Sequence, residues 1–189
     1  MKLFRITPGI NENIKYCEPQ IFEDSNWSNN SFFMNKYEKI YELPIPYYVT
    51  NKIPPEDFLI SHSFLISAKF LNLVKRFNKQ IRFFESDFFY QKKEKIWDTY
   101  YTMIYPEYNL LDFENSDCKY EINKTTGDKN IWLLKKIVLK KSKVEQLNFD
   151  NNFFCLKEMP TKLLCTEIAK KAIEEACLTG VNFEELEVM

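Results

Sequence analysis

Residues 100–120 read YYTMIYPEYNLLDFENSDCKY, a run of aromatic and aliphatic residues that breaks once at Pro106. The apolar part ends at Leu110 and Leu111 and gives way at once to polar residues. These are Asp112, Glu114, Asn115, Ser116 and Asp117. Asp and Ser side chains at the end of a strand hydrogen-bond to nearby backbone groups and so fix a turn. The stretch therefore predicts a buried strand that ends in a polar turn.

Apolar and β-branched runs on both sides of this stretch predict further strands. They cover residues 2–7, 14–17, 47–50, 57–60, 81–90, 96–105, 131–139, 153–156 and 181–183. Residues 123–129 (NKTTGDK) contain Gly127 and predict a turn, and the polar residues 19–30 predict an exposed loop. Four prolines between residues 44 and 55 exclude a helix there, because each proline removes an amide donor.

Two segments predict amphipathic helices, one capped by the Ser67 hydroxyl and one by that of Thr166. Gly180 follows the second helix, near the place of a C-terminal cap. The segments LISAKFLNLVKRFNKQIRFFE and LLCTEIAKKAIEEACLTGVNFEE share one pattern: apolar pair, hydroxyl cap, helix, turn, strand. We expect an α+β fold, a mostly antiparallel sheet with two amphipathic helices packed on it and two related helix–strand halves. Residues 1–56 would add N-terminal strands and the exposed loop to a core formed by residues 57–189.

Composition excludes several classes of protein. The 189 residues are 45% hydrophobic and 28% charged, as in a folded soluble domain. Three glycines are too few for a glycine-rich phosphate loop, and a net charge of −1 gives no strong attraction to nucleic acid or anionic membranes. No segment reaches the roughly 18 apolar residues that span a bilayer. Five cysteines without a CxxC pair, and an N-terminus unlike a signal peptide, predict reduced thiols in the cytoplasm.

No residues form a convincing catalytic or metal-binding set. His62 is the one histidine, so an acid–base enzyme would have to use it or a carboxylate with a shifted pKa. The acids at Asp112, Glu114 and Asp117 lack the glycine and terminal glutamate of a calcium loop. We therefore predict a protein without enzymatic activity, cofactor or metal, and an enzyme that uses His62 remains an alternative.

A lysine-rich strand keeps a second alternative open. Its lysines are Lys135, Lys136, Lys140, Lys141 and Lys143. They would contact phosphates while Trp132 stacks on a base, as in single-strand binding proteins. The same residues suit an exposed strand, where lysine discourages pairing with other chains. The near-neutral net charge favours the exposed strand.

Four segments occur in a familiar order: FLISAKFLNLVKRF, YYTMIYPEYNLLDFENSDCKY, IWLLKKIVLKK and LLCTEIAKKAIEEACLTGVNFEEL. The stretch from residue 57 to residue 185 resembles the eleventh class of bacterial immunity proteins from polymorphic toxin systems, formerly a domain of unknown function. Tyr101, Asp112, Ser116 and Gly180 match the pattern of that family. Family members often place an asparagine where this chain has Met103 to Tyr105, and residues 1–50 match no family pattern.

The resemblance implies an α+β protein that binds and neutralises a cognate toxin encoded by an adjacent gene, in contact-dependent or type VI secretion. We expect the toxin to meet the 19–30 loop and the acidic C-terminal stretch. The candidate partner-binding residues are Glu23, Asp24, Trp27, Glu184, Glu185 and Glu187. Such an acidic patch would imitate an anionic substrate and occupy a basic cleft of the toxin.

Overall fold

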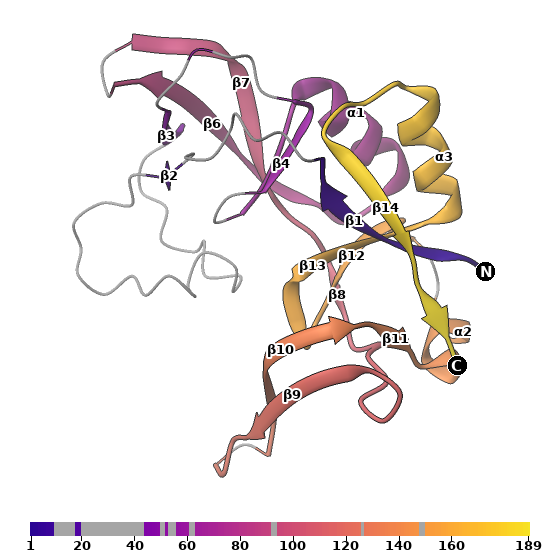
Figure 1. Cartoon of the computed structure of the whole chain (residues 1–189). Coiled ribbons are helices and arrows are strands. Elements are labelled where there is room, and N and C mark those ends of the chain that lie inside the picture. The colour runs from indigo at the N-terminus through magenta and orange to yellow at the C-terminus, as the bar shows by residue number, and fades with distance from the viewer. Residues whose placement is uncertain are drawn as a thin grey trace.

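The computed structural model describes residues 1–9, 18–19, 44–49, 52, 56–60, 63–91, 94–125, 127–147 and 150–189 (Figure 1). The predicted strand at 14–17, His62 and all of the predicted 19–30 loop except Pro19 lie outside these residues. Strands dominate the described part and are accompanied by α1 (Ala68–Phe77), α2 (Lys141–Glu145) and α3 (Glu167–Glu175). None of the described helices is long and apolar enough to cross a membrane.

The strands fall into two larger sheets and two short pairs. The strands are β1 (Leu3–Pro8), β2 (Glu18–Pro19), β3 (Ile45–Val49), β4 (Phe58–Ile60), β5 (Phe64–Ile66), β6 (Arg82–Tyr90), β7 (Glu94–Ile104), β8 (Glu107–Tyr108), β9 (Asp117–Ile122), β10 (Lys129–Lys136), β11 (Val138–Leu139), β12 (Phe153–Leu156), β13 (Met159–Thr166), β14 (Val181–Glu185) and β15 (Glu187–Val188). One sheet has the order β2-β3-β6-β7-β5-β4 and the other β14-β1-β13-β12-β8, while β10-β9 and β11-β15 form pairs. Most neighbours are antiparallel, which confirms the predicted α+β class.

The two larger sheets contain the same supersecondary unit twice. In the first unit, the hairpin β4-β5 leads through α1 to β6, and β7 lies between β5 and β6. In the second unit, the hairpin β12-β13 leads through α3 to β14, and β1 lies between β13 and β14. The inserted strand is antiparallel to both of its neighbours in each unit. The predicted pair of related helix–strand halves is therefore present in the topology.

The two helices begin with matching hydrogen bonds. Ser67 Oγ accepts from the backbone N–H three residues on and donates to Asp57 Oδ1 at 2.6 Å. Thr166 Oγ1 accepts in the same way and donates to Asn152 Oδ1 at 2.7 Å. Asp57 and Asn152 each directly precede the first strand of their unit. Both predicted caps are thus confirmed, and each cap is tied to its own hairpin.

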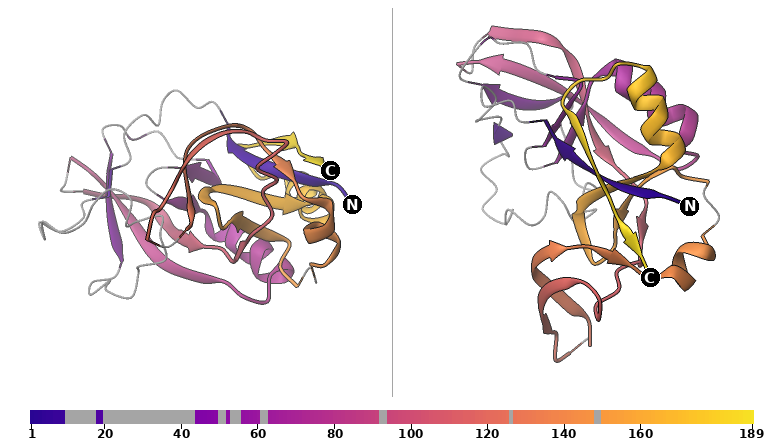
Figure 2. Two further views of the ribbon diagram at one scale, coloured as in Figure 1. Left: turned by 90° about the horizontal axis from the view of Figure 1, so that it is seen from below. Right: turned by 45° about the vertical axis from the view of Figure 1, so that its right-hand side comes forward.

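The start of each helix is also tied to the end of the other helix. Asp57 Oδ2 accepts from the backbone N–H of Thr179, just after α3, at 2.9 Å. Asn152 Nδ2 donates to the carbonyl of Phe77, at the end of α1, at 2.9 Å. The helices α1 and α3 therefore run antiparallel and in contact, as Figures 1 and 2 show.

An aromatic core joins the two units. The Phe70 ring of α1 lies 5.9 Å from Phe58 in β4 and 6.0 Å from Phe153 in β12, between ring centroids. All three side chains are at most 1% exposed. Ala169 and Ile173 of α3 are buried in the same cluster, so both helices cover one core. The division at residue 56 stays a prediction.

Several features differ from the sequence predictions. The strands β5, β9, β13 and β15 and the helix α2 were not predicted, and the predicted strand 131–139 is divided at Ile137 into β10 and β11. The helix α3 ends at Ala176, and Cys177 takes the left-handed conformation with a φ of 51°. Backbone bonds from Cys177 to Glu174 and from Leu178 to Ile173 complete this cap. Gly180 therefore belongs to the turn before β14, beyond the cap.

Replacing Tyr105 with phenylalanine will raise the free energy of unfolding by about 1 kcal/mol, because it removes a buried polar group that has no partner. Tyr105 is 3% exposed, and within the described residues its hydroxyl has no hydrogen-bond partner. Burial raises the pKa of this hydroxyl well above its usual value. Chemical denaturation of the two proteins measures the change.

Tyr47 provides the matched control. Its hydroxyl is also buried, but it lies 3.0 Å from Ser63 Oγ and 3.1 Å from Thr102 Oγ1. We expect Tyr47→Phe to lower the free energy of unfolding by about 1 kcal/mol or more, since two hydroxyl groups lose a partner. A destabilised Tyr105→Phe protein would contradict the assignment of an unpaired hydroxyl.

Candidate functional site

The polar turn that the sequence predicts after Leu111 is present. Asp112 Oδ1 accepts from the backbone N–H groups of Glu114 at 3.0 Å and Asn115 at 3.3 Å. The Asn115 side chain donates to Asp112 Oδ2 at 3.0 Å, and this bond contributes most to a lowered pKa of the Asp112 carboxyl. The residues Leu110 and Leu111 before the turn are buried. Asp112 therefore stabilises the turn by accepting these three hydrogen bonds.

Ser116 fastens the same turn to the neighbouring strand. Its hydroxyl accepts from the backbone N–H of Val138 at 3.0 Å and lies 3.2 Å from the carbonyl oxygen of the same residue. The backbone N–H of Asp112 donates to that carbonyl oxygen at 2.9 Å. The structure thus brings two of the predicted family residues, Asp112 and Ser116, together at the base of β9 and β10.

The strands β9 and β10 form a hairpin that stands apart from the two larger sheets (Figures 1 and 2). The predicted turn at 123–129 closes it, since the Gly127 N–H donates to the Asn123 carbonyl at 2.7 Å and Gly127 has a φ of 76°. The strand register shifts twice, between Ile131 and Leu133 and between Leu134 and Lys136. Such bulges increase twist and redirect side chains.

The hairpin exposes large apolar side chains at its outer part. Trp132 is 59% exposed, Ile122 60% and Tyr120 37%. The inner part is anchored by Leu134, which is buried in a core cluster together with Leu110 and Leu111. One end of the hairpin is therefore fixed to the body of the protein, and the other presents apolar surface.

The acidic C-terminal stretch is a row of ion pairs. Glu184 lies 3.1 Å from the Arg5 guanidinium, and Glu185 lies 2.9 Å from Lys2 Nζ, both across the β1–β14 pair. Glu187 lies 2.9 Å from Lys136 Nζ. Each predicted partner-binding glutamate at this end thus faces a cation of the same chain. Their binding role stays a prediction, as does that of Glu23, Asp24 and Trp27, which lie outside the described residues.

The comparison with protein families is decisive for classification. The model of the immunity protein family Imm11 matches residues 2–188. The chain belongs to the Imm11 family. No curated protein matches the chain. The Imm11 match reaches residue 2, whereas the sequence resemblance began at residue 57. The structure explains the extension, because β1 is an inner strand of the second unit.

The other two residues predicted to match the family pattern, Tyr101 and Gly180, lie away from the polar turn. Tyr101 is on β7, and its ring packs edge-on against Phe83 with centroids 5.7 Å apart. Gly180 lies in the turn before β14, where an added Cβ would come within 2.5 Å of the Phe58 carbonyl oxygen. The four residues therefore do not form one site, and these two support packing.

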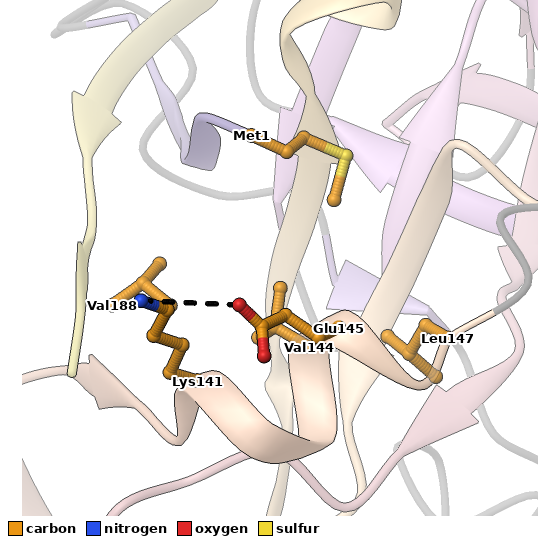
Figure 3. Close-up of a pocket in the computed structure, with 6 residues that line it drawn as sticks. All are labelled: Met1, Lys141, Val144, Glu145, Leu147 and Val188. Atoms are coloured by element: carbon orange, nitrogen blue, oxygen red, sulfur yellow. Dashed lines mark ion pairs between the residues drawn. The ribbon is translucent and has the colours of Figure 1, made fainter.

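A hollow beside α2 has a volume of about 400 Å³ (Figure 3). Its walls are formed by Met1, Lys141, Val144, Glu145, Leu147 and Val188. Its charged groups are Lys141 and Glu145, one turn apart on α2 with 3.9 Å between Nζ and Oε1. In this Imm11 protein the hollow is lined by four apolar side chains and one exposed ion pair, and this set resembles no catalytic arrangement.

The two buried cysteine thiols of this Imm11 protein, Cys155 and Cys165, are held in their uncharged form. Burial raises the pKa of the Cys155 and Cys165 thiols well above its ordinary value, which removes the reactive thiolate. Among the described residues no cluster of histidine, cysteine or carboxylate side chains has the arrangement of a metal site. His62 lies outside the described residues, so the structure does not place it.

Proposed function

We propose that this protein neutralises a cognate bacterial toxin by binding it in the cytoplasm, without catalysing a reaction. The observation that carries the proposal is the match of the Imm11 immunity family to residues 2–188. Immunity by binding needs a stable interface, and about 800 Å² per partner is typical of such complexes. A few buried aromatic side chains usually supply most of the affinity.

The test uses the product of the open reading frame beside this gene as the candidate toxin. We expect co-expression of the two proteins to restore growth, and a tagged copy of this chain to copurify with the toxin at a fixed ratio. Growth that stays inhibited, or two proteins that separate on purification, would refute the proposal.

The variant His62→Ala separates binding from catalysis. A binding protein should keep both protection and affinity, whereas an enzyme that uses His62 would lose protection while it still binds. Protection must also scale with the molar ratio of the two proteins, because one bound copy blocks one toxin molecule. An immunity enzyme would protect at far lower ratios.

A further inference from the structure

We propose that the toxin docks on the outer part of the β9–β10 hairpin, and that the docked toxin surface is an apolar pocket bordered by carboxylates. The inference rests on the proposed function and names the surface and the partner chemistry for it. Three properties of the hairpin support it: its exposed apolar side chains, its lysines without carboxylate partners and its rigid base.

Apolar exposure is concentrated on this hairpin. The described residues contain eight large hydrophobic side chains that are exposed, and three of them are Tyr120, Ile122 and Trp132. Trp132 stands between the two residues where the register first shifts, so it is the extra residue of a bulge. The bulge directs the Trp132 side chain outward from the hairpin. Tryptophan and tyrosine are the residue types that most often dominate binding energy.

The charges around these rings favour an acidic partner. Lys119 Nζ lies 5.3 Å from the Trp132 ring centre, and Lys129 Nζ lies 4.4 Å from that of Tyr120. Together with Lys135 they form no ion pair with any carboxylate in the part of the chain that the structure describes. Carboxylates on the toxin surface would form ion pairs with these lysines.

The glutamates of the acidic C-terminal stretch, unlike the hairpin lysines, already have partners of opposite charge. Glu184, Glu185 and Glu187 are each satisfied by a cation of the chain itself. A basic toxin surface would have to displace those cations before it could pair with the glutamates. The three glutamates are therefore less available to a partner than Lys119, Lys129 and Lys135 of the hairpin, which have no such ion pair among the described residues.

Contacts at the base and along the hairpin limit the entropy lost on binding. The Phe113 ring packs edge-on against Tyr120 with centroids 5.3 Å apart, and Lys129 Nζ lies 4.2 Å from the centre of the Phe113 ring. The Ser116 hydroxyl fixes the start of β9 to Val138. Because these contacts already order the side chains, little further ordering is needed in the complex.

Side-chain docking fits this hairpin better than addition of a partner strand. Lys119 and Glu121 lie two positions apart on β9, separated by Tyr120. Charged side chains on an edge strand discourage pairing with another chain. The same mixture argues against nucleic acid. Asp117, Glu121 and Asp128 lie on or beside the two strands, and the whole chain carries a net charge of −1.

The test measures binding of the neighbouring gene product to variants of the full chain by titration calorimetry. We expect Trp132→Ala to weaken binding by about 30-fold or more, as for a central aromatic anchor. Ile168→Ala is the matched control, because Ile168 is 64% exposed on α3. It should change affinity by less than about twofold. Thermal unfolding should be unchanged in both variants, since both side chains are exposed.

Charge is tested separately by association rates. We expect Lys119→Glu to slow association by about tenfold at low salt, and added salt to reduce the difference. Lys75→Glu is the control, because Lys75 Nζ lies 4.6 Å from the Phe83 ring centre in a similar cation–ring contact away from the hairpin. Its association rate should match that of the wild type.

The outcomes separate this inference from the proposed function. Wild-type binding that Trp132→Ala leaves unchanged overturns the hairpin surface alone. A wild-type protein that does not bind the gene product overturns both. Retardation of an oligonucleotide, or self-association, that Trp132→Ala abolishes while toxin binding persists also overturns the inference, because the hairpin would then serve another partner.

Discussion

Gly180→Ala will lower the free energy of unfolding by about 3 kcal/mol, combining left-handed strain with a steric clash. Gly180 has a φ of +77°, and an added Cβ would lie 2.5 Å from the Phe58 carbonyl oxygen and 2.7 Å from Glu56 Cβ. The backbone has little room to move, because the Gly9 N–H donates to the Gly180 carbonyl at 2.8 Å. Chemical denaturation of the purified protein measures the loss.

Gly127 separates the two causes. Its φ of +76° is nearly the same, but an added Cβ would meet nothing within 4 Å. Gly127→Ala should therefore cost only about 1 kcal/mol, the conformational part. If the two variants lost equal stability, the close approach of Gly180 to Phe58 would not be a feature of the protein in solution.

Local chemistry predicted α1 and α3, but it failed for the short helix α2 and for several strands, among them β9 and β13. Ser67 and Thr166 cap helices whose apolar residues recur at helical spacing, and both signals lie within one short segment. The strand β9 alternates charged and apolar residues over only six positions, and most of these positions are exposed, so pairing with β10 defines it. The strand β13 contains Pro160, and its burial does not alternate along the strand, although it pairs with the adjacent β12 as well as with the distant β1.

In the candidate site, too, contacts between residues close in the sequence were predictable and contacts between distant residues were not. The turn at Asp112 was predictable because its hydrogen bonds join residues two or three positions apart. The pairing of Glu184 with Arg5 spans 179 positions, so the sequence showed an acidic stretch where the fold has ion pairs. The exposure of Trp132 agrees with the predicted exposed lysine-rich strand, but the bulge at Trp132 depends on the register with β9 and left no signal in the sequence.

The repeated unit explains why residues far apart in the sequence carry equivalent tasks. Asp57 and Asn152 hold the caps of α1 and α3, and each also reaches the end of the opposite helix. The sequences around them share only a pattern of residue types. Through these hydrogen bonds a few polar side chains cross-link the two units.

Asn78→Ala will lower the free energy of unfolding by about 4 kcal/mol, because it leaves two buried backbone groups without partners. Asn78 is 6% exposed. Its side-chain amide forms with the Phe153 backbone the two hydrogen bonds that a neighbouring strand would otherwise form. Its Nδ2 donates to the Phe153 carbonyl at 2.7 Å, and the Phe153 N–H donates to its Oδ1 at 2.9 Å. Phe153 is fully buried, so water cannot take over either bond. Equilibrium denaturation gives the loss directly.

Asn78→Asp tests the same pair of bonds through pH. The introduced carboxylate would still accept from the Phe153 N–H but would face the Phe153 carbonyl oxygen, so burial and this contact raise its pKa above the unfolded value. A raised pKa means that the folded state binds the proton more tightly, and stability is lost as pH rises through that pKa. We expect the deficit relative to the wild type to be smaller at pH 4 than at pH 7, because the protonated acid can donate to the carbonyl. A deficit that stays constant between these pH values would show that the Nδ2 bond to Phe153 contributes little, and that the cost of Asn78→Ala comes from the acceptor side alone.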